Sequence, residues 1–140
     1  MFLLAGVNDQ YRSRPVRAFS TEFALLLRRA TSLARRRPSR VIAISIPDWG
    51  ATPFAEGRDR ALIGREIEAY NASARELANT AGVRWVDITN VSRRMQHEPN
   101  LVVADGLHPS GDMYRLWAEE LLVVSKAALA RTPKGSGVPR

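Results

Sequence analysis

The run RVIAISI at residues 40–46 decides the fold, because it is a short and almost wholly apolar segment bounded by polar and turn residues. Such a run is typical of a strand in a parallel sheet that is covered on both faces. The run MFLLAGV at residues 1–7 and the run VRWVDI at residues 83–88 have the same pattern. We therefore predict three buried parallel strands over these three ranges.

Helical patterns alternate with these strands. Apolar residues recur at 3–4 spacing over residues 16–33, 63–81 and 111–130. Gly82 follows the second pattern at a position typical of a helix C-terminus, and Ser110 is suited to cap the third. The order β-α-β-α-β-α, with right-handed crossovers, predicts a three-layer (αβα) flavodoxin-like domain with a parallel sheet and helices on both faces.

Length and composition place the chain among one-domain globular proteins. It has 140 residues, of which 45% are hydrophobic and 25% charged, so a packed core is expected. We assign residues 1–131 to this α/β domain. Residues 132–140 are expected to be a disordered tail, because they hold almost no core-forming side chain. The chain has no cysteine, which excludes disulfides and thiolate metal sites.

No targeting or membrane segment is evident. The opening MFLLAG is too short for a signal peptide and lacks a basic leader and a cleavage site. No apolar stretch reaches the roughly 18 residues that a membrane span requires. The chain as given is therefore expected to be soluble and cytoplasmic, with secretion an alternative if a signal peptide has been lost upstream.

The chain is strongly basic, with a formal net charge of +7 that comes almost entirely from arginine. This charge raises nucleic-acid binding as an alternative. The densest cluster, at the end of the first predicted helix, comprises Arg35, Arg36, Arg37 and Arg40. Cations suit the negative end of a helix dipole, and no base-reading motif accompanies them. We therefore expect a solvated surface and no nucleic-acid partner.

Polar residues follow the predicted strands, where ligands of open α/β sheets bind. Asn8 follows the first strand, Asp48 the second, and the loop DGLHPS at residues 105–110 leads into the last helix. Asp48 and Asp87 could hold a metal together with His108, but two carboxylates and one histidine at these spacings are a poor ligand set. No metal and no other cofactor is expected.

The loop DGLHPS carries the sharpest chemical signal. A carboxylate three residues before a histidine, as in Asp105 and His108, can accept a hydrogen bond from the imidazole Nδ1–H. This bond would fix the tautomer and leave Nε2 free as a general base, as in hydrolytic triads. The alternative is an aspartate in a turn beside a histidine at a helix start.

The block GVND at residues 6–9 carries the second signal. Asn8 could direct its amide N–H₂ into a site as an oxyanion donor, Gly6 would allow a close approach, and Asp9 could bond backbone amides of the loop. The alternative is an ordinary Asn-Asp turn. Tyr11 and Trp49 lie near strand-end loops and could line an acyl or sugar pocket, although ordinary packing also explains them.

These two blocks together resemble the SGNH (GDSL-type) hydrolase family, which has a G-x-N-D block after its third strand and a D-x-x-H-P block near its C-terminus. The resemblance extends from Gly6 to the last helix. It implies that Asn8 is an oxyanion-hole donor, that His108 is the general base and that Asp105 orients it. It further implies a serine esterase for small-molecule esters, with short-chain acyl or acetylated-sugar esters as the general substrates.

The chain departs from the family in lacking a nucleophile. The family's serine lies in a Gly-Asp-Ser block after its first strand, and no Gly-Asp-Ser occurs in this sequence. The chain therefore resembles a C-terminal portion without the first two strands, from a late start codon or a truncated gene, with little activity of its own. A catalytically inactive product or a binding module of the same fold is the alternative. The bare first strand could also promote self-association.

Overall fold

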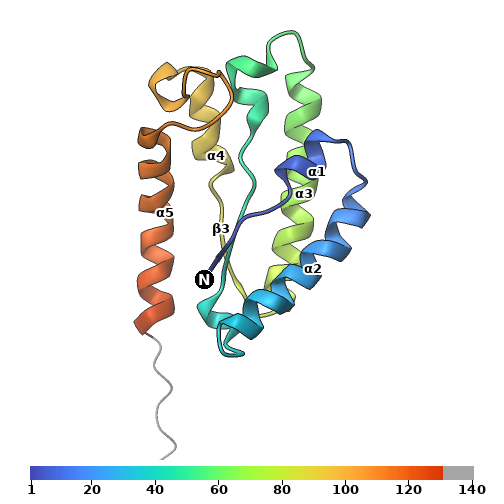
Figure 1. The fold of residues 1–140 in the computed structure, drawn as a ribbon, viewed down its shortest axis with the longest axis vertical. Coiled ribbons are helices and arrows are strands. Elements are labelled where there is room, and N and C mark those ends of the chain that lie inside the picture. The colour runs from blue at the N-terminus through green and yellow to red at the C-terminus, as the bar shows by residue number, and fades with distance from the viewer. Residues whose placement is uncertain (131–140) are drawn as a thin grey trace, which may run out of the picture.

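The computed structural model describes residues 1–130, so the predicted tail at residues 132–140 lies outside the described residues. One parallel sheet has the order β1 (Phe2–Leu3), β2 (Ile42–Ile44) and β3 (Arg84–Val86), with β2 at its centre. In the register of the sheet, Ile42 lies opposite both Phe2 and Arg84. The predicted α/β class and parallel sheet are confirmed (Figure 1).

The three strands are shorter than the predicted ranges, and at the ends of β2 and β3 side chains replace the backbone ladder. The N–H of Ser45 still donates to the carbonyl of Val86. The next N–H, of Ile46, donates instead to Oδ1 of Asn71 at 2.8 Å. The N–H of Ile88 donates to Oγ of Ser45 at 2.8 Å. Polar side chains therefore satisfy the backbone beyond β2 and β3, as buried backbone requires.

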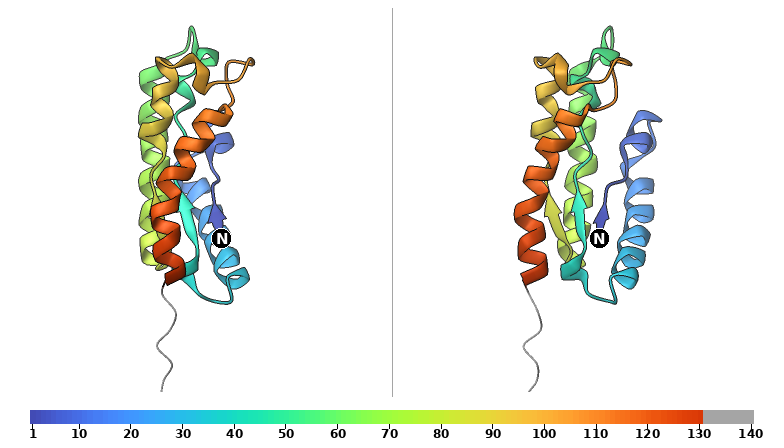
Figure 2. Two further views of the ribbon diagram at one scale, coloured as in Figure 1. Left: turned by 90° about the vertical axis from the view of Figure 1, so that its left-hand side faces the viewer. Right: turned by 60° about the vertical axis from the view of Figure 1, so that its left-hand side comes forward.

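Long helices cover the two faces of the sheet (Figure 2). The helices α2 (Val16–Leu33) and α3 (Arg60–Thr80) pack on one face and α5 (Gly111–Ala130) on the other. Successive residues of β2 serve the two layers, since Ala43 packs with α2 and α3 while Ile44 packs with α5. The three helices confirm the predicted pattern, although α3 begins three residues before the predicted Ile63.

Two predicted helix signals are confirmed by hydrogen bonds. Gly82 follows α3 with a φ of 68°, and the next N–H, of Val83, donates to the carbonyl of Ala78 at 2.9 Å. This is the reversal typical of a helix that ends at a glycine. Ser110 precedes α5, and its Oγ accepts a long hydrogen bond of 3.4 Å from the N–H of Met113.

The connections are short helical turns. The helix α1 (Val7–Tyr11) replaces the loop that we predicted after the first strand, because Gly6 redirects the chain with a φ of 123° and its carbonyl accepts the N–H of Gln10. The helix α4 (Thr89–Ser92) follows β3. Single 3₁₀ turns occupy Pro38–Arg40, Trp49–Ala51, Pro53–Ala55, Arg93–Gln96 and Pro99–Leu101.

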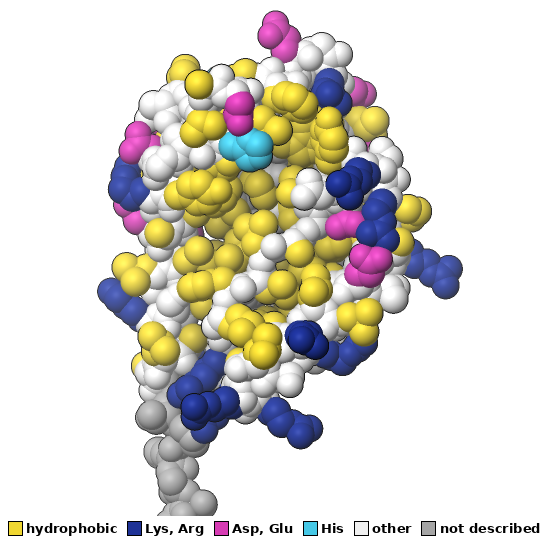
Figure 3. Space-filling model, viewed as in Figure 1, with side chains coloured by type: hydrophobic (Ala, Val, Ile, Leu, Met, Phe, Trp, Pro, Cys, Tyr) yellow, Lys and Arg dark blue, Asp and Glu magenta, His cyan; other side chains and the backbone are white. Residues whose placement is uncertain are grey.

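The first strand is not covered on both faces, which corrects our prediction. Phe2 is 55% exposed and Leu4 is 41% exposed. Figure 3 shows apolar side chains gathered on this face of the molecule. The strand is an edge with one neighbour, so α5 covers β2 and β3 more fully than β1. Self-association through this edge remains a prediction. None of the helices in residues 1–130 has the length and apolar character needed to cross a membrane.

Candidate active site

The loop at residues 105–110 holds a carboxylate against an imidazole. Gly106 turns the chain with a φ of 73°, which favours glycine. Oδ1 of Asp105 accepts the N–H groups of Leu107 at 2.8 Å and His108 at 2.9 Å, and Oδ2 lies 2.6 Å from Nδ1 of His108. An ionised carboxylate can only accept, so Nδ1 carries the proton and Nε2 is left as an acceptor.

The same hydrogen bonds change the acidity of Asp105. The N–H of His108, the N–H of Leu107 and then the imidazole of His108 lower the pKa of this carboxyl from 3.8 to about 2. Donors to the ionised form favour that form. Asp105 is therefore a carboxylate at neutral pH, as an acceptor for Nδ1–H must be.

We expect Asp105 to titrate near pH 2, and His108→Ala to leave its pKa below the usual range. The substitution removes the imidazole but keeps the two backbone donors, which are the larger causes. Because the pKa is lowered, the contribution of the loop's hydrogen bonds is present above the unfolded pKa and is lost as the pH falls towards 2. Carbon-detected NMR of the carboxyl group measures both values, and a titration near pH 4 in the unsubstituted chain would contradict this assignment.

Asn8 and His108 line one cavity of about 370 Å³, at the carboxyl ends of the strands. Asn8 lies in α1 and is exposed, and its amide bonds no other described residue, so its donors are available. Apolar side chains from five segments form the walls, namely Leu4, Val7, Tyr11, Pro47, Trp49, Phe54, Met95, Leu107, Pro109, Tyr114 and Trp117. A larger cavity lies between α2 and α3, but neither His108 nor Asn8 lines it, so the smaller one is the candidate active site.

Gly6 and Asp9, at the start of α1, contact other parts of the chain and so fix the position of this helix beside the cavity. A Cβ on Gly6 would come within 2.6 Å of Cε2 of the buried Phe19, so only glycine permits this approach. Asp9 does not bond the backbone amides of the loop as we predicted. Its carboxylate forms an ion pair with Arg14, which also binds Glu22 at 2.6 Å. Asp9 binds Arg14 in place of the local amides because a hydrogen bond between two charged groups is stronger than one to a neutral N–H.

Three aromatic rings form one wall of the site. The ring centroids of Tyr11 and Trp49 are 5.3 Å apart, and those of Trp49 and Phe54 are 6.2 Å apart. The guanidinium of Arg58 lies 5.1–5.7 Å from the three centroids, in cation–π range. Buried Gln10 orients the ring of Trp49, because Oε1 of Gln10 accepts the indole N–H of Trp49 at 2.6 Å.

The cavity has two tryptophans that are equally buried but differ in the hydrogen bonding of the indole N–H. Trp49 and Trp117 are each 7% exposed, but Nε1 of Trp117 bonds no described residue. We expect Trp49→Phe to lower the free energy of unfolding by about 1–2 kcal/mol more than Trp117→Phe, because it leaves the acceptor on Gln10 unpaired. Urea unfolding of both variants measures the difference, and equal losses would show that the bond to Gln10 adds no net stability.

Several lining residues escaped the sequence analysis. Tyr114 and Trp117 lie on the first two turns of α5 and line the cavity. Their places three and six residues after Gly111 could have been found from the loop DGLHPS, since a helix that begins beside the loop of His108 has its first turns next to the same cavity. Met95 gives no such signal, because the segment after β3 approaches the cavity only in three dimensions.

The other polar candidates are structural. Asp48 pairs with Arg93 at 2.9 Å, Asp87 accepts from Ser45 at 3.1 Å, and Ser45 is fully buried. Residues 1–130 contain no group of three potential metal ligands. Within that range no serine lines the cavity of His108. His97 is exposed and lines no part of the site.

Comparisons with known proteins agree with the fold of this chain. Among solved structures, LAE5, an α/β hydrolase from the metagenome of Lake Arreo, superposes with a TM-score of 0.58 at 20% identity, covering 91% of this chain and 59% of that one. An acetyl xylan esterase from Geobacillus stearothermophilus gives a TM-score of 0.60 at 17% identity, covering 94% and 61%.

The chain thus spans about three fifths of the length of these two structures. No curated protein sequence matches it significantly. The family model that describes GDSL-like lipases and acylhydrolases matches residues 1–116, which is most of the chain. The chain therefore belongs to the GDSL-like lipase/acylhydrolase family.

Proposed function

We propose that this chain supplies the base, its orienting acid and an oxyanion donor of a serine ester hydrolase. The observation that carries the proposal is the imidazole of His108, held through Nδ1 by Asp105 at 2.6 Å, on the same cavity as the unbonded amide of Asn8. The imidazole side chain is 70% exposed, so the rest of the ring is open to a substrate and a nucleophile. This combination of roles is that of a hydrolytic triad and its oxyanion hole.

In the proposed reaction, a serine Oγ attacks the ester carbonyl while His108 takes its proton at Nε2. The carbonyl oxygen becomes the oxyanion and accepts the amide N–H of Asn8. The C–O bond to the alcohol then breaks, and the imidazolium returns the proton to the leaving alcohol. Water repeats the sequence on the acyl-serine and releases the acid. Asp105 stabilises the imidazolium in both halves.

Short-chain acyl or acetyl esters are the substrates that we propose. A cavity of about 370 Å³ with mostly apolar walls is at the small end of ligand sites. The exposed rings of Tyr11 and Phe54 offer flat faces on which a sugar or another ring can pack. The similarity to an acetyl xylan esterase supports the same class, although at 17% identity it shows the fold alone.

A non-catalytic binding module of this fold is the second candidate. It is favoured by the absence of Gly-Asp-Ser from the sequence and of a serine from the cavity lining in residues 1–130. Such a module would keep the aromatic wall and the cavity but would not turn over an ester. The two candidates make opposite predictions about His108 in a kinetic assay.

The test begins with the DNA upstream of the Met1 codon. An in-frame Gly-Asp-Ser, followed by two strand-like segments, is expected, and the product of the longer reading frame is expected to hydrolyse an aryl acetate. The 140-residue chain itself is expected to give the same low background as its His108→Ala variant. A stop codon close upstream, or a longer product whose turnover does not exceed that of its His108→Ala variant, would favour the second candidate.

A further inference from the structure

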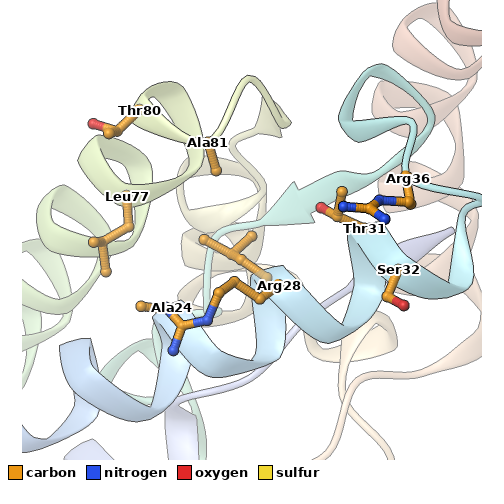
Figure 4. A pocket seen from close by; sticks show the side chains of 9 residues that line it. Ala24, Arg28, Thr31, Ser32, Arg36, Leu77, Thr80 and Ala81 are labelled. Atoms are coloured by element: carbon orange, nitrogen blue, oxygen red, sulfur yellow. The ribbon is translucent and has the colours of Figure 1, made fainter.

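A second cavity of the described residues, larger than the cavity of His108, has no part in the proposed reaction. It is a groove of about 540 Å³ between the C-terminal ends of α2 and α3, at the end of the sheet opposite His108 (Figure 4). Its lining comprises Ala24, Leu27, Arg28, Thr31, Ser32, Arg36, Leu77, Thr80 and Ala81. The lining thus combines an apolar floor, two guanidinium groups and three hydroxyl groups, without a carboxylate.

The two arginines of the groove differ from the paired arginines elsewhere in the chain. Carboxylates within 4 Å neutralise four others, namely Arg14, Arg93, Arg94 and Arg115. Neither Arg28 nor Arg36 forms an ion pair with any residue of the described range, and both are exposed. The sequence explains the difference, because residues 23–47 contain six arginines and no aspartate or glutamate.

The hydroxyl groups of the groove are also unused. The side chains of Thr31, Ser32 and Thr80 make no hydrogen bond within residues 1–130. Other helical hydroxyls do bond the protein, as Ser20 does through the carbonyl of Val16 at 2.7 Å. The three free hydroxyls and the two unpaired guanidinium groups leave hydrogen-bond donors available along the groove.

The backbone holds Arg36 at the groove in an uncommon conformation. Arg35 and Arg36 both have positive φ, 56° and 57°, a left-handed region that residues with a Cβ rarely adopt. The N–H of Arg36 donates to the carbonyl of Thr31 at 2.9 Å, which folds the chain back over the last turn of α2. A glycine would make this turn with less strain, so the two arginines adopt it at a conformational cost.

We propose that this groove is a binding site for an organic phosphate. The phosphate oxygens would pair with the exposed guanidinium groups of Arg28 and Arg36, because the planar guanidinium fork matches phosphate oxygens in pairs. The apolar body of the ligand would pack on Leu27 and Leu77. A net charge of +7 would also steer an anion towards the chain.

Phenyl phosphate is a suitable probe, with inorganic phosphate and phenol as its two halves. NMR titration of the 140-residue chain is expected to show saturable shifts of groove amides with phenyl phosphate, at an affinity above that for either half. Arg28→Gln and Arg36→Gln are each expected to weaken binding about fivefold or more, since each removes a charge-assisted pair. Their neighbours Arg29 and Arg35 do not line the groove, so Arg29→Gln and Arg35→Gln are matched controls with changes of about twofold at most.

Three results would overturn the proposal. Shifts that do not saturate would show that no site exists. Equal affinities for inorganic phosphate and phenyl phosphate would show that the apolar floor of the groove does not bind the organic part of the ligand. Similar weakening in all four variants, with steep salt dependence, would indicate a general polyanion surface of the kind that nucleic acid binds. The titration does not depend on the esterase assignment, because His108→Ala is expected to bind phenyl phosphate unchanged.

Discussion

In a form of the protein that carries the nucleophilic serine, His108→Ala is expected to lower kcat for an aryl acetate by about 10⁴-fold or more. Nucleophile and base act as one unit, so losing the base alone removes nearly the whole benefit of the triad. His108 is exposed at the mouth of the cavity and contributes little to the core, so the fold is expected to survive the substitution. Steady-state kinetics with an unchanged thermal midpoint would separate loss of chemistry from loss of structure.

Two further variants identify the roles of the neighbours. Asp105→Asn is expected to lower kcat by about 10³–10⁴-fold, because an amide nitrogen facing Nδ1 would favour the wrong imidazole tautomer. Asn8→Ala is expected to lower kcat by about 10²–10³-fold with little change in KM, because the oxyanion exists only in the transition state. A large rise in KM for Asn8→Ala, with kcat unchanged, would make Asn8 a substrate-binding residue instead.

His97 is the natural control for these variants. It is the only other histidine of the chain, and it is exposed in a polar segment that lines no part of the cavity. His97→Ala is expected to leave kcat within about twofold of the unsubstituted protein, as surface substitutions away from a site usually do. Equal losses for His97→Ala and His108→Ala would contradict the assignment of the base.

The parts of this fold that sequence predicts are those encoded locally. The apolar spacing of α2 and the glycine that ends α3 each depend on a few neighbouring residues. The Asp105–His108 pair is local too, since the two side chains meet across a turn of three residues. Periodicity, a required positive φ and a short loop all act within one or two turns of chain, and sequence displays them directly.

The parts that sequence did not predict depend on contacts between distant segments. Strand β2 ends early because Asn71, 25 residues away, takes the N–H of Ile46. Asp9 has two kinds of partner within reach, backbone amides and Arg14, and the pattern GVND does not say which one prevails. The cavity wall likewise unites α1, the segment before α3 and the first turns of α5. In each case the chain has alternative partners, and which one it binds depends on the three-dimensional arrangement of distant segments.

Gly6→Ala is expected to lower the free energy of unfolding by about 3 kcal/mol, because its new methyl group would meet a buried ring. The new Cβ would lie 2.6 Å from Cε2 of Phe19, which is only 3% exposed and packs against Phe23 and Tyr70 at 5.2 and 4.8 Å between centroids. The ring therefore has little room to move, and overpacking of this kind costs about 1–3 kcal/mol. The φ of 123° adds about 1–3 kcal/mol of backbone strain.

Gly57→Ala separates these two contributions, because Gly57 has a φ of 75° but no atom within 4 Å of its Cβ position. It is expected to lose only the backbone part, about 1 kcal/mol. Thermal unfolding should place Gly6→Ala about 10 °C below the unsubstituted chain and Gly57→Ala about 4 °C below it. Equal shifts would show that Phe19 yields freely. The contact between Gly6 and Phe19 would then not be what holds α1, and with it Asn8, at the mouth of the cavity.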